Sequence, residues 1–344
     1  MAKKIRVLAA ILAAVLFSLC FVGCASCKDK KAVATCGEYE IPYEYLRFVT
    51  LNTKADLATT FANEVPQDQD GTIWDDPELA KKYEPLLEEK VWALIADNYA
   101  LLVACEEYGI GKDVFEGKEI EKSVDASMDA LIATYDTYRE YEAALEASFM
   151  TEDVFRFHFA LEEMKVRLYQ AMAKKGEFIQ DEEEFFEWLS EGNYAYVQHI
   201  KREVGDGDES EAEYFFAEQA YTELISAVDP VAALEELIGL QYLNEDTSNT
   251  TPYFIFPHAY DDALVEAALN LGYIGQVSPI TESNGDYYIL VLMEEEEGAL
   301  SSQLTDLLAL YQWGVIAERV EETKQDIKIT KTKYGKEINL LEIE

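Results

Sequence analysis

Residues 251–293 read TPYFIFPHAYDDALVEAALNLGYIGQVSPITESNGDYYILVLM, and this stretch decides the fold. It begins with an aromatic run typical of a strand. Asp261 and Asp262 then precede an apolar helical pattern at 263–269, and a short carboxylate caps such a helix by accepting from its first N–H groups. Asn284-Gly285 predicts a turn into residues 287–292, whose β-branched and aromatic side chains predict a buried strand. The stretch therefore predicts strand, helix and strand in that order.

The turn after this helix resembles part of a known family. Residues 271–280, LGYIGQVSPI, resemble the Gly-x-(Val/Ile)-Ser pattern of parvulin-type peptidyl-prolyl isomerases, and residues 194–200 resemble the first strand of that fold. The resemblance implies a parvulin-like domain over 191–298, with a small antiparallel sheet and helices. A generic helix-to-strand unit is the alternative explanation of the same periodicity.

The resemblance also assigns site residues. His199 occupies the place of the first family histidine, Asp246 lies near the Cys/Asp position, and Tyr260 and Leu264 fall where the proline pocket is lined. Tyr288 stands where the second histidine is expected, although a tyrosine still donates a hydrogen bond. The resemblance implies no cofactor and no metal. It leaves two alternatives, a degenerate or weak isomerase and a fully active one.

The rest of the chain is predicted to be mainly helical. Helical periodicity extends over 83–108, 151–172 and 301–324. Residues 107–110 and 145–154 resemble, in that order, segments of the foldases PrsA and SurA. The resemblance implies an α+β fold in which a discontinuous helical chaperone domain, 35–190 with 299–344, carries the parvulin-like domain as an insertion.

The N-terminus predicts a lipoprotein signal peptide over residues 1–23. A basic start is followed by an apolar run too short to span a membrane, and Gly23-Cys24 resembles a bacterial lipobox. Cys24 is the expected lipidation site, and residues 24–34 are the expected tether. The alternative is an ordinary cleaved signal and a free secreted protein.

The net charge and the cysteines limit the classes of ligand and the kinds of site that the chain could have. Removal of residues 1–23 takes away three basic residues, so 68 acidic residues would face 25 basic ones. This balance argues strongly against nucleic acid and anionic membrane surfaces as direct ligands, because phosphate binding needs Lys and Arg. Cys36 and Cys105 form no metal-ligand pattern, and they are either a disulfide or two buried free thiols.

These observations predict an extracytoplasmic, lipid-anchored folding factor on the outer face of a bacterial membrane. Its partners would be unfolded or newly translocated polypeptides. Three alternatives remain: an active parvulin-type isomerase, a lipoprotein solute-binding protein, and a structural surface lipoprotein. A solute-binding protein requires two lobes with repeated strand–helix alternation, which residues 80–190 lack.

Overall fold

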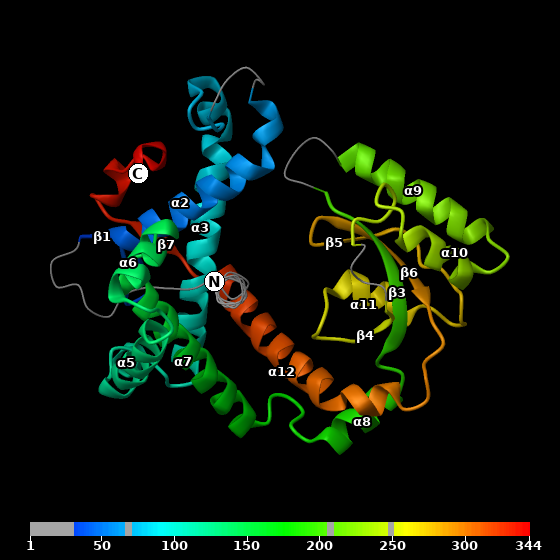
Figure 1. Cartoon of the computed structure of the whole chain (residues 1–344). Helices are drawn as coiled ribbons and strands as arrows, with labels where there is room; N and C mark the ends of the chain where they lie inside the picture. Colours follow the sequence, from blue (N-terminus) through cyan, green and yellow to red (C-terminus); the bar gives the residue numbers. More distant parts are fainter. Residues whose placement is uncertain (1–30, 66–70, 205–209, 247–250) are drawn as a thin grey trace. The chain divides into compact units, whose positions relative to one another are not determined.

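A computed structural model describes residues 31–65, 71–204, 210–246 and 251–344. The expected signal peptide and Cys24 lie outside these residues. The chain divides into two compact units: unit 1 ends at Lys175 and resumes from Arg319 to Glu344, and unit 2 is Gly176–Glu318. Both units combine helices with small antiparallel sheets, so the fold is the expected mainly helical α+β fold (Figure 1).

Unit 1 is a set of helices with one three-stranded sheet. Its elements are β1 Ala32–Cys36, β2 Tyr39–Pro42, α2 Tyr43–Thr60, η1 Ala62–Glu64, α3 Pro77–Glu107, α4 Lys112–Phe115, α5 Lys118–Ile132, α6 Tyr138–Ala147, α7 Glu152–Lys175, β7 Ile329–Lys331, η2 Gly335–Glu337 and η3 Leu340–Glu342. Because β1 begins at Ala32, the last three residues of the expected tether are strand.

The sheet of unit 1 joins the two distant parts of its chain. Its order is β2-β1-β7, and Thr35 of β1 pairs with Glu40 on one side and with Thr330 on the other. The last turns of α12 (Ala299–Asp326) also belong to this unit, where Lys324 Nζ lies 2.5 Å from Asp97 Oδ1 of α3. The C-terminal segment is therefore part of the helical unit that the N-terminal residues begin.

Helix α3 begins six residues before the predicted start at residue 83. Asp76 caps it, with its carboxylate accepting from the N–H groups of Glu78 and Leu79 at 2.8 and 3.2 Å. Pro77 occupies the first turn, where its missing N–H costs nothing. The predicted stripe of α7 is confirmed as buried, and it consists of Phe157, Leu161, Met164, Leu168 and Met172.

Unit 2 contains the second sheet and the helices that cover it. Its elements are α8 Glu182–Ser190, β3 Ala195–Arg202, α9 Ser210–Ser226, α10 Pro230–Ile238, β4 Tyr253–Ile255, α11 Asp262–Leu269, β5 Thr281–Ser283, β6 Asp286–Leu292 and the first part of α12. The strand order is β4-β3-β6-β5, with antiparallel pairing throughout.

Alternation along the strands gives this sheet two apolar faces. Ile200, Ile289 and Val291 pack against α9 and α10 on one face. Val197 and Leu290 pack against α11 on the other, and Figure 1 shows the helices on these two sides of the sheet. Since successive residues of a strand point to opposite faces, odd-numbered residues of β3 lie on the α11 side.

The first part of α12 packs inside unit 2. Gln312 Nε2 donates to the carbonyl oxygen of Ile179 at 2.9 Å, and the rings of Tyr311 and Phe185 lie 5.3 Å apart. Unit 2 therefore includes residues 176–190 and 299–318. The domain division expected from the sequence places the same residues in the helical domain. That division, 35–190 with 299–344 against 191–298, remains a proposal about domains.

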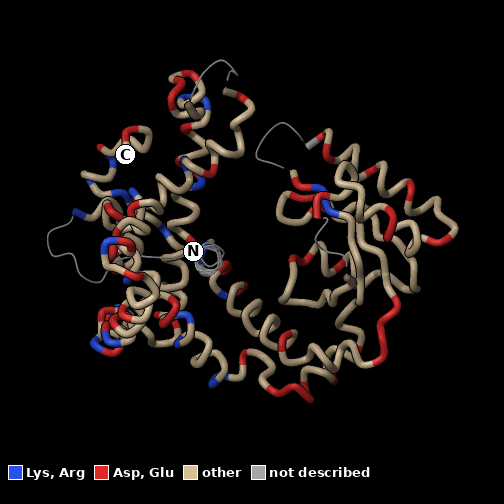
Figure 2. Tube along the Cα trace, in the orientation of Figure 1, with Lys and Arg blue, Asp and Glu red and all other residues tan. Residues whose placement is uncertain are grey.

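Acidic residues are distributed over both units. Figure 2 shows Asp and Glu along most elements, and the run Glu294–Glu297 lies between β6 and α12. Within the described residues, no helix combines the length and apolarity needed to cross a membrane. Cys36 and Cys105 are both free and buried, so of the two alternatives the structure has thiols rather than a disulfide.

Candidate functional site

His199 lies in the middle of β3, one of the two inner strands of the unit 2 sheet. It is in register with Leu290 of β6, and only 4% of its surface is exposed. Its odd position places the imidazole on the α11 side, the side that carries Val197 and Leu290. The strand therefore presents a histidine at the edge of an apolar layer, where burial disfavours its charged form.

Two polar side chains contact the two ring nitrogens of His199. The Tyr253 hydroxyl lies 2.9 Å from Nδ1, and Asp246 Oδ2 lies 3.3 Å from Nε2. If the Tyr253 hydroxyl donates to Nδ1, the ring proton sits on Nε2 and faces the Asp246 carboxylate. A neutral imidazole satisfies both contacts in this tautomer.

The electrostatics agree with a neutral ring. Burial lowers the pKa of His199 below its ordinary value, while the carboxylate of Asp246 opposes this shift. Burial also raises the pKa of Tyr253, with Tyr260 and Tyr288 adding to the effect, so its hydroxyl stays protonated and able to donate. The cluster thus holds neutral hydrogen-bonding groups beside one carboxylate.

Asn244 fixes the loop that carries Asp246. Its Oδ1 accepts from the N–H of Lys201 at 3.0 Å, and its Nδ2 donates to the carbonyl oxygen of Asp246 at 3.0 Å. The N–H of Glu245 donates to the carbonyl oxygen of Lys201. Asn244 is fully buried, so these bonds tie the loop to β3 two residues beyond His199.

Tyr288 completes the polar side of the cluster. Its ring centroid lies 5.6 Å from that of His199, and the Lys201 ammonium lies 5.9 Å from the Tyr288 centroid. Lys201 is held by Asp286 at 3.0 Å. Burial raises the pKa of Tyr288 and outweighs the opposing effect of Lys201, so the tyrosine keeps its proton and offers a donor beside His199.

The two expected pocket residues lie on the same side of the sheet. The Tyr260 ring lies 5.9 Å from the Tyr253 ring, centroid to centroid, so it borders the cluster through Tyr253. Leu264 is only 4% exposed and belongs to the core between α11 and the sheet. The structure therefore brings His199, Asp246 and Tyr288 together, and it places Tyr260 and Leu264 beside them; their roles in binding or catalysis remain predictions.

Sequence reasoning missed Tyr253 as a site residue. In the sequence it is only one residue of the aromatic run that predicts a strand, whereas in the structure its hydroxyl is a direct partner of His199. The register of β4 places Tyr253 opposite Val197, two residues from His199 on the same face. Alternation along residues 195–199 and 253–255 was the available signal, but it becomes useful only when the register is known.

This arrangement can offer hydrogen bonds to a bound amide without a change in the charge of its groups. The barrier to prolyl isomerisation is about 20 kcal/mol and arises from amide resonance, so catalysis consists of binding the twisted amide more tightly than the planar one. Neutral donors beside an apolar layer are appropriate for that purpose. In the described residues, no group of three or more His, Cys, Asp or Glu side chains is placed to hold a metal ion.

No protein-family model matches the chain, and no curated protein matches it. Solved structures that resemble it include foldase protein PrsA from Streptococcus pneumoniae, at 14% identity over 78% of this chain and 95% of that chain, with a TM-score of 0.31. The peptidylprolyl isomerase PrsA from Bacillus anthracis matches at 15% identity over 67% and 96%, with a TM-score of 0.33. PrsA from Bacillus subtilis matches at 17% identity over 76% and 89%, with a TM-score of 0.26. Identity and TM-score are both too low to transfer a function.

Proposed function

We propose that the chain is an extracytoplasmic folding factor that binds unfolded polypeptides, with a parvulin-like module that isomerises prolyl bonds weakly or not at all. The observation that carries the proposal is a pocket of about 640 Å³ between α2 and α3 of unit 1. Tyr45, Phe48 and Val49 form its apolar side, and Lys90 and Asp97 add charges to its lining. Polar side chains, among them Asn52, Thr53 and Asp56, also line the pocket. An apolar surface with polar groups beside it suits the side chains that an unfolded client exposes.

A direct binding experiment tests this proposal. A permanently unfolded polypeptide with a fluorescent label is titrated with the protein, and the same polypeptide in its native state is the control. Binding of the unfolded form alone is expected. Ala93→Trp, which places a bulky ring in the pocket lining, is expected to weaken binding, whereas Ala130→Trp at an exposed position of α5 is its matched control. Equal binding by both variants, or no binding by the parent, would overturn the proposal.

Active prolyl isomerisation is the second candidate function. It is favoured by the contacts that His199 makes with Tyr253 and Asp246. Cis-to-trans isomerisation of a short proline peptide is measured for the parent, His199→Ala and Tyr288→His. The folding-factor proposal predicts little catalysis by the parent and a gain in Tyr288→His, which provides the second family histidine. Strong parent catalysis that is lost in His199→Ala would instead identify a working isomerase.

The lipid anchor at Cys24 is part of the same proposal. It is supported by the basic and apolar residues before Gly23-Cys24. One acyl chain gives only marginal membrane binding, so a stable anchor needs more than one chain. Cys24→Ser is expected to move the protein from the membrane fraction to the soluble fraction, and a variant that stays membrane-bound would contradict the anchor.

The described residues give no support to a solute-binding protein. Every strand pairing among them is antiparallel, in sheets of three and four strands. Two α/β lobes need parallel strands connected through helices, because crossover connections cover both faces of a parallel sheet.

A further inference from the structure

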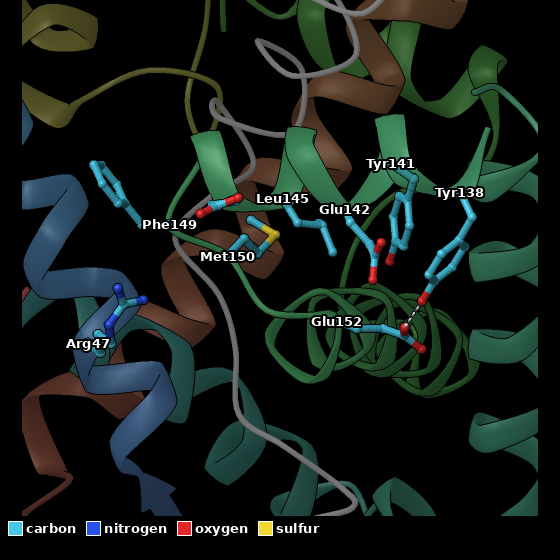
Figure 3. Close-up of a pocket in the computed structure, with 9 residues that line it drawn as sticks. Arg47, Tyr138, Tyr141, Glu142, Leu145, Phe149, Met150 and Glu152 are labelled. Carbon is cyan, nitrogen blue, oxygen red and sulfur yellow. Dashed lines mark hydrogen bonds between the residues drawn. The ribbon is translucent and has the colours of Figure 1, made fainter. Parts of the chain in front are cut away.

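A second pocket of unit 1 combines aromatic rings with carboxylates. It has a volume of about 330 Å³ and lies where α6 ends and α7 begins (Figure 3). Tyr138, Tyr141 and Glu142 extend from α6 toward Glu152 in the first turn of α7. Glu146, Phe149 and Met150 complete this side of the pocket.

The carboxylates of this pocket have little cationic compensation in the described part of the chain, where Arg156, one turn further along α7 and paired with Asp125, attracts Glu152. None of the ion pairs found there involves Glu142, Glu146 or Glu152, although Glu152 accepts from the Tyr138 hydroxyl at 3.2 Å. Arg47 lies at the opposite side of the pocket, and its Nε donates to the main-chain oxygen of Glu344 at 2.6 Å. Three carboxylates against one such arginine give the pocket a net negative charge.

Tyr141 supplies an independent sign of a missing ligand. Its side chain is fully buried, it lines the pocket, and its hydroxyl has no hydrogen-bond partner among the described residues. A buried hydroxyl without a partner loses about 1–3 kcal/mol relative to one that is satisfied, and a ligand that enters the pocket would recover this loss. The hydroxyl offers an acceptor to a ligand that carries N–H groups.

The backbone at Phe149 is also unusual. Its φ of 55° is left-handed, a conformation that glycine adopts at the end of a helix without strain. Phenylalanine at this position keeps a ring in the pocket wall at the expense of backbone strain, and 39% of Phe149 is exposed. Backbone strain of this kind is concentrated at functional sites.

The chemistry of the lining selects the class of ligand. The carboxylates surround a space larger than one metal ion needs, and no metal-binding group occurs among the described residues. Aromatic faces and carboxylates together bind organic cations, and the planar guanidinium adds a fork of N–H donors that matches carboxylates.

We propose that this pocket binds the guanidinium group of an arginine side chain in a bound polypeptide. Glu142 and Glu152 receive its N–H groups, the Tyr138 ring stacks on its plane, and the Tyr141 hydroxyl accepts a further hydrogen bond. Only the source of the arginine, an unfolded polypeptide, rests on the proposed function. The acidic chain, with 68 Asp and Glu against 28 Lys and Arg, attracts such segments from a distance.

The test uses Met150 as a reporter, because it lines the pocket and the chain has six methionines to resolve. Protein with ¹³C-labelled methionine methyl groups is titrated by NMR with short peptides that contain arginine, lysine or citrulline at one position. Citrulline has the shape of arginine without its charge. With the arginine peptide, saturable shifts of the Met150 signal are expected, with a dissociation constant of about 1 mM. The lysine peptide is expected to give weaker shifts, and the citrulline peptide none.

Matched variants distinguish binding in this pocket from attraction by the acidic surface as a whole. Glu142→Gln with Glu152→Gln is expected to weaken arginine binding about tenfold. The control, Glu78→Gln with Glu89→Gln, removes one first-turn and one mid-helix glutamate from exposed positions of α3 and is expected to bind as the parent does. Equal shifts with citrulline, equal weakening in both double variants, or no Met150 shift would overturn the proposal. These outcomes are independent of client binding at the α2–α3 pocket, which Ala93→Trp tests.

Discussion

The Tyr253 hydroxyl lies 2.9 Å from Nδ1 of His199, and the two rings meet edge to face at 90°. This contact fixes the orientation of the imidazole and directs Nε2 toward Asp246. With a tyrosine in this position, the cluster combines neutral donors and acceptors with the single carboxylate of Asp246.

The ionisation of His199 is the first prediction. Its pKa lies below the ordinary value of 6.5 because burial disfavours the imidazolium, and Asp246 raises it in part. Asp246→Asn is therefore expected to lower the pKa of His199 further. An NMR titration of the imidazole measures this, with Glu266→Gln at an exposed position of α11 as the control. A pKa that rises in Asp246→Asn would contradict the contact.

His158 in unit 1 predicts a loss of stability in acid. Burial lowers its pKa to about 3, and its ring lies against Phe48 with centroids 5.7 Å apart. Between about pH 6.5 and 3 the unfolded chain therefore binds a proton that the folded chain does not, and stability falls as the pH falls.

Urea unfolding of the parent and of His158→Leu isolates this effect from the many carboxylates. From pH 7 to pH 4.5 the free energy of unfolding of the parent is expected to fall by about 2–3 kcal/mol more than that of His158→Leu. Parallel pH profiles of the two proteins would show that His158 is not buried in its neutral form.

The cysteines of unit 1 are predicted to be unreactive while the chain is folded. Burial, with a contribution from Glu106, raises the pKa of Cys36 to about 11 and that of Cys105 to about 12. Little thiolate is then present at pH 8, and the thiolate is the reactive form. Peptide-level mass spectrometry after alkylation should show both residues modified in urea and spared in buffer. A peptide that links Cys36 to Cys105 would contradict the free thiols.

Gly314 is predicted to be required for the packing of α12. A Cβ at this position would lie 1.6 Å from the carbonyl oxygen of His258, so the main chain would have to move. Alanine favours a helix over glycine by about 1 kcal/mol, but a clash with backbone outweighs that gain. Gly314→Ala should lower the melting temperature, whereas Ser301→Ala, exposed on the same helix, should not. A more stable Gly314→Ala protein would contradict the close approach.

Local chemistry made the decisive stretch predictable. Asp261 caps α11 by accepting from the N–H of Ala263 at 3.0 Å, and Asn284 and Gly285 both adopt positive φ in the turn between β5 and β6. Caps and turns of this kind depend on residues close in sequence, so the sequence alone predicts them.

The site was predictable only in part, because its remaining contacts are long-range. The contact between Tyr253 and His199 depends on the register of β4 beside β3. The residues that connect the two strands do not determine this register by themselves. The periodicity over 83–108 places the start of α3 six residues too late, because the first turn follows from the cap Asp76 and from Pro77 and not from apolar spacing. The pocket at Tyr141 depends on how α6 meets α7, which periodicity does not specify.

The most direct test of the central claim is suppression of client aggregation. A client is diluted from denaturant with an equal amount of the protein, and light scattering is compared with that of the Ala93→Trp variant and of an inert acidic protein. The parent is expected to suppress light scattering by the client. The Ala93→Trp variant is expected to suppress it less, and the inert protein not at all. Scattering unchanged by a stoichiometric amount of the parent would contradict the assignment as a folding factor.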